Sequence, residues 1–322
     1  MEKYTVKTPE GTCDILGNLL KKRREIEEKC YNFFSRAGYI PINTPSLEYF
    51  NTINLHSQHF NEEDLYKLTD TTGRLLILRP DHTLPIARAF ASRHSEIPLP
   101  ARFYYSGDVY RVNTVDSGKN NQIYQVGVEI IGNSGNASDL EILSGAVECL
   151  EKCDTADYIL EIGNVGFFNE IMKSLNAPDD IKEKIRFLIE IKNKPELNKL
   201  LDTIVGNNDE VRILRELPNL FGGVEVVEKA ESLYPAWQTE DVLKDVRLLY
   251  NCIVTLPKKG RIQLDLGLVH RLDYYTGIVI KGYIAGSEII SGGRYDNLMQ
   301  EFGINMPAIG FAIDLDEIVR KF

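Results

Sequence analysis

The sequence predicts an α+β fold in which an antiparallel sheet carries a mostly helical insertion. Segments typical of strands stand on both sides of a long block that has helical spacing. The length of 322 residues is enough for one large domain, or for a domain with a sizeable insertion. Hydrophobic residues make up 43% of the chain and charged residues 26%, as in globular proteins that bury a substantial core.

The first predicted element is a helix. Residues 18–37 place their apolar side chains along one helical stripe, which ends at Gly38. Prolines then interrupt the helical pattern, and Pro80 closes an apolar run. Strands or extended segments are therefore predicted at 38–50, 74–79, 101–111 and 121–132. The last two flank a polar loop, residues 112–121, whose Ser-Gly and Asn content is typical of a flexible hairpin connection.

The second half of the chain begins with a helix near Ser138, whose spacing from Glu141 matches a capping box. Further strands and a last helix are predicted at 158–168, 261–267, 274–283 and 288–293, and at 311–321. Between them, helical spacing predominates, with breaks at prolines and at a Gly-Gly pair. We therefore divide the chain into a core, residues 1–166 and 252–322, and a helical insertion, residues 167–251.

The charge of the chain argues against a nucleic-acid-binding protein. A formal net charge of -10 and a pI near 5.2 oppose generic binding to a phosphate backbone. The basic run Lys21–Arg24 falls on the first predicted helix, where we interpret it as a solvated face.

Composition also bears on location and on metal binding. No apolar stretch approaches the roughly 18 residues that a membrane span needs, and the first residues lack the apolar core of a signal peptide. The five cysteines lack CxxC spacing, which favours a reduced, cytoplasmic protein. We interpret Cys149 and Cys153, four apart on a predicted helix, as buried hydrophobic residues rather than a metal pair. Neither a metal nor a cofactor is expected.

One strand face is a candidate ligand site. In the strand Gln122–Ile131, Gln125, Gly127 and Glu129 share one face, and the alternate residues form the core face. An amide and a carboxylate thus stand on either side of a residue without a side chain, which leaves a slot for a small ligand. The carboxylate would attract an ammonium or an imidazole. The alternative is an ordinary solvent-facing strand surface.

Three other clusters allow both a functional and a structural interpretation. Asp81 and Thr83, just past a strand end, could hold an amino group or simply cap the helix that follows. Tyr274 and Tyr275 would point to opposite faces of a strand, one into the core and the other towards a ligand. In the segment 291–296, two adjacent glycines permit close approach of a bound molecule, or mark a turn or bulge.

Taken together, these segments resemble the histidyl-tRNA synthetase family in identity and in order. The resemblance covers nearly the whole chain and implies the class II aminoacyl-tRNA synthetase fold, an antiparallel sheet flanked by helices and usually dimeric. Because the chain stops directly after the third motif, we expect no C-terminal anticodon-binding domain. The matching segments are TPEGTCDIL, GYIPINTPSLE, LYKLTDTTGRLLILRPDHT, FYYSGDVYR, YQVGVEIIG, LVHRLDYYTG, SGGRYDNL and PAIGFAIDLDEI.

The resemblance implies a histidine pocket. In that family the substrate is surrounded by an Arg of the second motif, a Gln and a Glu of the next strand, an acid and a Thr after the LRP turn, and tyrosine of the DYY sequence. Asp81 stands where the family more often has Glu, which gives a shorter reach. The matching positions, our candidate histidine- or effector-binding residues, are Asp81, Thr83, Arg111, Gln125, Glu129, Tyr274 and Tyr275.

The positions that handle ATP in that family depart from its pattern. His270 replaces an Arg, and the neighbouring Arg271 lies one residue along, on the opposite face of an extended backbone. Asn113 replaces an acid, the loop 117–121 lacks its arginines, and Glu317 replaces the third motif's Arg. Because a triphosphate needs cations and is repelled by a carboxylate, we expect no aminoacylation and no catalytic residues.

This selective loss resembles the family of ATP phosphoribosyltransferase regulatory subunits, particularly in LVHRLDYYTG and SGGRYDNL. That resemblance implies a non-catalytic chain of histidine biosynthesis that binds a short-form catalytic subunit and transmits feedback inhibition by histidine. It also implies self-association as a dimer, and no tRNA partner is expected. Two alternatives remain: a divergent histidyl-type adenylating ligase that uses His270, Arg271 and Lys119, and a free-standing amino-acid-binding module.

Overall fold

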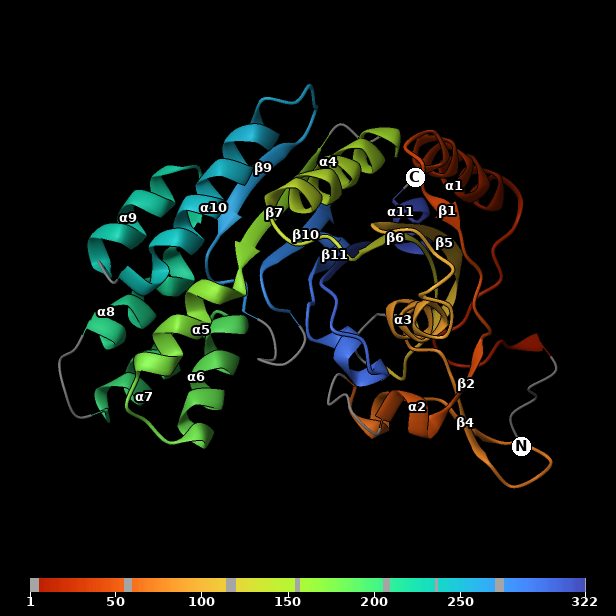
Figure 1. The fold of residues 1–322 in the computed structure, drawn as a ribbon, viewed down its shortest axis with the longest axis horizontal. Helices are drawn as coiled ribbons and strands as arrows, with labels where there is room; N and C mark the ends of the chain where they lie inside the picture. Colours follow the sequence, from red (N-terminus) through yellow and green to blue (C-terminus); the bar gives the residue numbers. More distant parts are fainter. Residues whose placement is uncertain are drawn as a thin grey trace. The chain divides into compact units, whose positions relative to one another are not determined.

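The computed structural model describes residues 6–54, 60–113, 120–153, 157–204, 209–234, 237–269 and 275–321. Contacts between residues divide the chain into two compact units. The first unit comprises Met1–Asn133 and Asn297–Phe322, and the second unit comprises Ser134–Asp296. Each unit combines a sheet with helices, so the predicted α+β class is confirmed (Figure 1).

The first unit contains the strands that carry most of the candidate residues. Its larger sheet has the order β1 (Ile40–Pro41), β5 (Ala101–Tyr110), β6 (Gln122–Ile131) and β12 (Ala308–Asp314). A smaller sheet has the order β2 (Leu47–Tyr49), β4 (Leu75–Leu78) and β3 (Lys67–Thr69). β5, β6 and β12 pair antiparallel, as predicted, and the short edge strand β1 runs parallel to β5.

Helices cover the first unit's sheet, and α1 (Gly17–Arg36) packs on one of its faces (Figure 1). The ring of Phe34 on α1 lies 5.7 Å from that of Tyr104 and 6.2 Å from that of Phe311. Val128 shares this face and is fully buried, as the predicted core face of β6 requires. The unit's other helices and 3-10 turns are α2 (Phe50–Asn54), η2 (Glu62–Asp64), α3 (Thr83–Ala91), η4 (Leu298–Phe302) and α11 (Leu315–Val319).

The second unit has its own strands in the order β11 (Ser287–Arg294), β10 (Ile278–Ile284), β7 (Tyr158–Asn164), β9 (Arg261–Asp265) and β8 (Phe221–Gly222). α10 (Trp237–Val254) runs beside β7 and β9 and contacts α4 (Asn136–Lys152) (Figure 1). The remaining helical elements are α5 (Val165–Ser174), α6 (Asp179–Glu190), α7 (Lys194–Asp202), α8 (Asp209–Glu216), η3 (Leu217–Asn219) and α9 (Glu225–Leu233).

Two helix predictions require correction. The last helix was predicted over 311–321, but residues up to Asp314 belong to β12, and α11 covers only Leu315–Val319. Pairing of β12 with β6 holds these residues extended. The predicted capping box at Ser138 is also wrong, because α4 begins at Asn136 and the Ser138 hydroxyl donates to the carbonyl of Gly135 at 3.0 Å.

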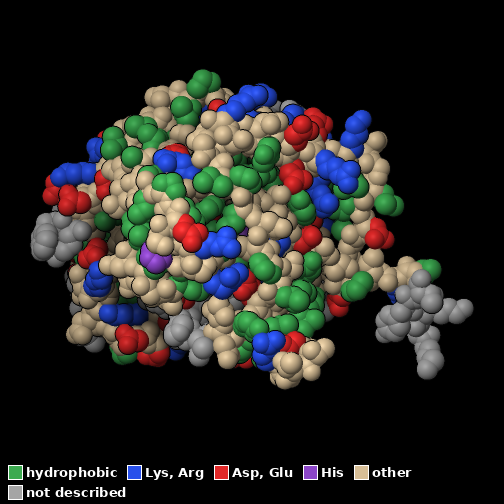
Figure 2. Space-filling model, turned by 45° about the vertical axis from the view of Figure 1, so that its right-hand side comes forward, with side chains coloured by type: hydrophobic (Ala, Val, Ile, Leu, Met, Phe, Trp, Pro, Cys, Tyr) green, Lys and Arg blue, Asp and Glu red, His purple; other side chains and the backbone are tan. Residues whose placement is uncertain are grey.

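The structure confirms the interpretation of the two helical cysteines but not that of the basic run on the first helix. Cys149 and Cys153 are fully buried, and the Cys153 thiol donates to the Cys149 carbonyl, which confirms their interpretation as core residues. Arg23, assigned to a solvated face, instead lies 2.9 Å from the buried Asp316 carboxylate and over the Tyr124 ring. Acidic and basic side chains are interspersed on the described part of the face in Figure 2.

Within the described part of the chain, no helix combines the length and the apolar character that a bilayer crossing requires.

Candidate functional site

The candidate face of β6 is buried, not solvent-exposed. Gln125, Gly127 and Glu129 lie on the side opposite to α1, with only 8% of Gln125 and 1% of Glu129 exposed. An ordinary solvated strand surface is therefore excluded. A carboxylate so deeply placed needs polar partners, because an ionised group loses its water on burial.

Thr83 supplies one of these partners. Its hydroxyl donates a hydrogen bond of 2.8 Å to Oε1 of Glu129, although the two residues are far apart in sequence. Thr83 is the first residue of α3, so the start of that helix is directed onto the face of β6. The structure thus brings together two of the candidate residues.

The second carboxylate oxygen of Glu129, Oε2, packs against Gly310. It lies directly across from Glu129 in the β6–β12 pairing, and a Cβ at this position would overlap the carboxylate at Oε2. Only glycine lets the acid lie flat against the neighbouring strand. Sequence reasoning missed this residue, because its role depends on the register between two distant strands.

The slot predicted above Gly127 is not open. Tyr105 lies across from Gly127 on β5, and a Cβ at Gly127 would overlap the tyrosine hydroxyl and the backbone carbonyl of Phe311. Tyr105 is 3% exposed, so its ring is part of the interior. The absence of a side chain at Gly127 therefore accommodates Tyr105, and the prediction of an empty slot is wrong.

His82 supports Tyr105 from the other side. The two rings are stacked with their centroids 4.4 Å apart, and His82 Nε2 lies 3.2 Å from the carbonyl oxygen of Gly107. Since a carbonyl only accepts, Nε2 carries the proton. Burial, and then the nearby Arg79 guanidinium, lower the pKa of His82 to about 3. The imidazole is therefore neutral at physiological pH.

The sequence left two roles open for Asp81 and Thr83, capping the helix that follows and holding a ligand. Oδ1 of Asp81 accepts a hydrogen bond of 3.1 Å from the backbone N–H of Leu84, as a helix cap does. Asp81 is 8% exposed. The Thr83 hydroxyl turns to Glu129 instead of capping. Asp81 thus caps α3, and Thr83 lies on the candidate face; the proposed ligand role of Asp81 stays a prediction.

Arg111 lies near the turn at Pro80 that precedes α3. Its Nε donates to the backbone carbonyl of Pro80 at 2.8 Å, and its guanidinium lies 5.6 Å from the centroid of the Phe60 ring. The side chain is only partly buried. Its position beside the LRP turn leaves part of the guanidinium accessible to an anion.

In the second unit, Tyr275 precedes β10 and does not belong to a strand. A Cβ at Gly293 would overlap the Tyr275 ring, so this glycine accommodates the tyrosine. Arg294 binds Asp139, Ser138 and Asp296 within the same unit. Tyr274, His270, Arg271 and Lys119 lie outside the described residues.

We call Thr83, Gln125 and Glu129 the amino-acid half of the site, and Asn113 and Glu317 the nucleotide half. In the nucleotide half, Asn113 Nδ2 donates to the Asn120 carbonyl at 2.6 Å, and its backbone N–H donates to Asn121 Oδ1 at 2.9 Å. The Glu317 carboxylate pairs with Lys321 and Arg320 of its own helix region. These polar groups are engaged by the protein itself.

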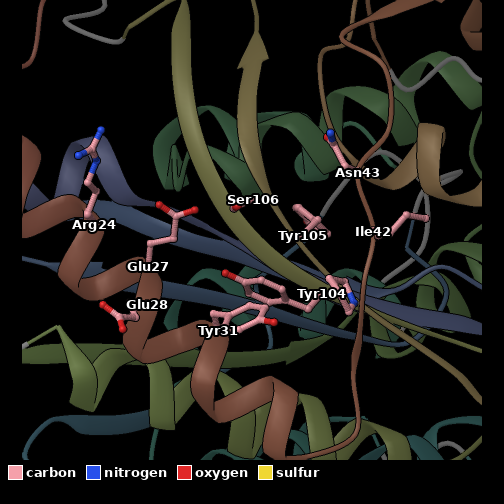
Figure 3. Close-up of a pocket in the computed structure, with 10 residues that line it drawn as sticks. Arg24, Glu27, Glu28, Tyr31, Ile42, Asn43, Tyr104, Tyr105 and Ser106 are labelled. Atoms are coloured by element: carbon pink, nitrogen blue, oxygen red, sulfur yellow. The ribbon is translucent and has the colours of Figure 1, made fainter.

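A groove of about 560 Å³ lies on the opposite face of the first unit's sheet. Glu28 is one of its lining residues, and in Figure 3 Glu27 and Tyr31 of α1 point toward Ser106 and Tyr104 of β5. The rings of Tyr31 and Tyr104 meet edge to face with centroids 5.5 Å apart. The sheet separates this groove from the amino-acid half, so the two are different surfaces.

Sequence comparison identifies a family model and several curated relatives. Residues 11–318 match the model of histidyl-tRNA synthetase. The chain is 38% identical to the ATP phosphoribosyltransferase regulatory subunit of Clostridium kluyveri, over 97% of this chain and 81% of that protein. It is 39% identical to the protein of the same name from Clostridium acetobutylicum, over 99% of this chain and 79% of that protein.

Solved structures show the same fold. A crystal structure of an ATP phosphoribosyltransferase regulatory subunit/histidyl-tRNA synthetase from Bacillus halodurans superposes with a TM-score of 0.90 at 29% identity, over 99% of this chain and 84% of that one. A histidine–tRNA ligase subunit from Alicyclobacillus acidocaldarius gives a TM-score of 0.79 at 24% identity, over 99% and 98%. The predicted class II synthetase-like fold is therefore confirmed.

Proposed function

Because the chain belongs to the ATP phosphoribosyltransferase regulatory subunits, a family with the histidyl-tRNA synthetase fold, we propose that it binds histidine and transmits feedback inhibition to a catalytic phosphoribosyltransferase subunit. The observation that carries the proposal is the buried Glu129 carboxylate, held by Thr83 on the face that also carries Gln125. A carboxylate in such a place favours a ligand with an N–H or ammonium group, and histidine has both.

The amino-acid half is suited to binding without chemistry. Glu129 and Thr83 are fixed by the register of β12 and by the start of α3, so they are in place before a ligand arrives. The regulatory effect would then arise from linkage, because histidine shifts the complex only if it binds one state better than the other. A coupling of about 1–3 kcal/mol is typical for such systems.

We further propose that the chain does not adenylate histidine. Asn113 and Glu317 offer an amide and a carboxylate where the synthetases hold a metal-supporting acid and an arginine, and both are engaged internally. Histidine-dependent ATP–pyrophosphate exchange separates this proposal from a divergent histidyl-type ligase. Exchange above the background of a buffer control would favour the ligase.

The remaining elements of the proposal concern partners and location. We propose a hetero-oligomer with the short-form catalytic subunit, self-association of this chain as a dimer, no tRNA partner and a cytoplasmic location. The net charge of -10 supports the absence of a tRNA partner, because binding to a polyanion is electrostatically opposed.

Co-expression tests the proposal directly. A tagged form of this chain is expected to copurify with a short-form catalytic subunit, and the complex is expected to be active and inhibited by histidine. A free-standing binding module would bind histidine but fail to copurify. A complex that is active but insensitive to histidine would refute the feedback role.

A further inference from the structure

Helix α6 of the second unit carries two apolar faces. One face, with Ile185 and Ile189, is fully buried. The other carries Phe187 and the C-cap residue Ile191, which are 51% and 50% exposed. Side chains four residues apart lie one above the other on a helix. Because a surface helix normally needs only one apolar face, the second, exposed face indicates a binding partner.

A groove of about 430 Å³ lies between this exposed face and α7. The two helices lie next to each other in Figure 1. Half of the lining residues are apolar, and the half-exposed ring of Phe187 makes this a surface groove rather than an enclosed cavity. The lining residues are Lys184, Phe187, Leu188, Glu196, Lys199 and Leu200.

The turn between the two helices is held by polar contacts within the second unit. Lys192 Nζ donates to Oδ2 of Asp265 at 2.6 Å, and that carboxylate is fully buried. The Asn193 side chain accepts a hydrogen bond from the backbone N–H of Glu196 and so caps α7, and Pro195 lies in the first turn of this helix. The groove is therefore formed before a partner binds, which lowers the entropic cost of association.

The charge around the groove differs from that of the whole chain. Residues 179–202 hold six acidic and six basic side chains, so α6 and α7 together are neutral in a chain of net charge -10. On α6, the buried Arg186 pairs with Glu183 at 2.8 Å and with Glu190 at 2.6 Å. These two carboxylates are therefore engaged away from the groove, and neither lines it.

Two lysines border the groove, Lys184 on α6 and Lys199 on α7, with side chains 64% and 74% exposed. Lys184 lies 3.8 Å from Asp180, and Lys199 lies 2.8 Å from Glu196. Ion pairs as exposed as these contribute little free energy, so both ammonium groups can exchange their partners at small cost. An apolar groove bordered by lysines is complementary to an apolar ridge flanked by acids.

We propose that the groove between α6 and α7 is the docking surface for the catalytic phosphoribosyltransferase subunit, which lays an amphipathic helix into it. The apolar side of that helix covers Phe187 and Leu200, and acidic side chains at its edge face the two lysines. A second copy of this chain is the less suitable occupant, because a two-fold contact brings the lysines of both copies to one groove. The inference rests on the proposed function, which requires a hetero-oligomer, and deepens it by naming the surface and its chemistry.

Biolayer interferometry of the full regulatory chain with the short-form catalytic subunit tests the apolar contact. Phe187→Glu places an acid in the groove, and Leu248→Glu on α10 is the matched control, because Leu248 is also 51% exposed and does not line the groove. Phe187→Glu is expected to weaken binding at least about tenfold, and Leu248→Glu should stay within about twofold of wild type. Both variants should bind histidine as wild type does, which shows that they fold.

The charged border is tested by Lys184→Glu/Lys199→Glu. The control is Lys173→Glu/Lys244→Glu, which makes the same charge change at side chains that are 71% and 61% exposed and also paired with acids along their own helices. The first pair is expected to weaken binding about tenfold at low ionic strength and less at high salt, and the control pair within about twofold.

Unchanged binding in Phe187→Glu, or an equal loss in Leu248→Glu, would overturn the inference and leave the proposed hetero-oligomer intact. A loss in Phe187→Glu without one in Lys184→Glu/Lys199→Glu would overturn the acidic chemistry assigned to the partner. If Phe187→Glu instead lowers the sedimentation mass of the regulatory chain alone and binds the catalytic subunit normally, the groove belongs to a second copy and the inference also fails. Absence of binding by wild type would refute the proposed function itself.

Discussion

The amino-acid half and the nucleotide half of this site place their polar groups in different surroundings. In the amino-acid half, Thr83 donates a hydrogen bond to Glu129 on a buried sheet face, and the Glu129 carboxylate packs against Gly310. In the nucleotide half, Asn113 fastens a loop, and Glu317 pairs with cations of its own helix region. The first arrangement holds a carboxylate on a buried sheet face, and the second uses its polar groups to fasten a loop and a short helical region.

The difference agrees with the proposed function, in which a synthetase fold binds an amino acid without activating it. Holding an amino acid needs a few fixed hydrogen-bonding groups, which the register of β6 with β12 supplies. Activating it needs cations at the phosphates, whereas the proposal places Asn113 and Glu317 at two of these positions. The predictions below test whether the two halves are as independent as this comparison implies.

The largest effect is expected from Glu129→Gln. The amide keeps the size of the side chain but removes the charge that faces the ligand, so histidine affinity should fall by about 2–3 kcal/mol, or roughly 30- to 150-fold. Calorimetric titration measures this, with Glu28→Gln on the opposite face as the control. Unchanged feedback inhibition in Glu129→Gln would place the effector elsewhere.

Gly310→Ala should damage the same half through geometry alone. The added methyl group overlaps the Glu129 carboxylate, so the free energy of unfolding is expected to fall by about 1–3 kcal/mol, with a loss of histidine binding. Urea denaturation of the single variants and of Gly310→Ala/Glu129→Ala forms a double-mutant cycle. A Gly310→Ala cost that is the same in both backgrounds would mean that Glu129 is not the residue displaced.

Thr83→Val should have a smaller effect on binding. It removes the donor to Oε1 of Glu129, so histidine affinity should fall by about 1–1.5 kcal/mol, or roughly tenfold. Thr83→Ser keeps the hydroxyl and is expected to bind within about twofold of wild type. If the Thr83→Val and Thr83→Ser variants bind histidine with equal affinity, the hydrogen bond from Thr83 to Glu129 does not contribute to binding.

The smallest effect concerns stability and pH at Asp314. The pKa of this group is raised in the folded state, so above pH 6 the folded chain holds a charge that is better solvated when unfolded. Asp314→Asn should therefore be more stable than wild type by about 1 kcal/mol at pH 7.5. As the pH falls from 6 towards 4, wild type takes up the proton and the difference should vanish. Chemical denaturation at several pH values gives this difference, and a gap that widens at low pH would contradict it.

The sequence was informative about which groups are proposed to bind histidine, and less so about how they are arranged. Alternation along β6 placed Gln125 and Glu129 on one face, and the family resemblance added Thr83. The role of Gly310 and the filling of the slot at Gly127 by Tyr105 depend on pairings between distant strands. Local spacing carries no information about such register, so a glycine that admits a ligand looks the same as one that admits a neighbouring ring.

The start of α11 was predicted wrongly for a related reason. Phe311 and Ile313 suit either a short helix or a strand, and pairing with β6 decides for the strand. The family resemblance assigned Asp81 to the ligand, and it could not show that this side chain also caps the backbone N–H of Leu84. Replacing it with Glu would test whether that role is lost as the reach increases.

The independence of the two halves is tested most directly by titrating histidine into the regulatory chain alone, in the presence and absence of saturating Mg·ATP. A chain that keeps the amino-acid half and has lost the nucleotide half should bind histidine with the same Kd in both titrations. Histidine binding that tightens with Mg·ATP in the isolated regulatory chain would contradict this account, because both ligands would then share a working synthetase site.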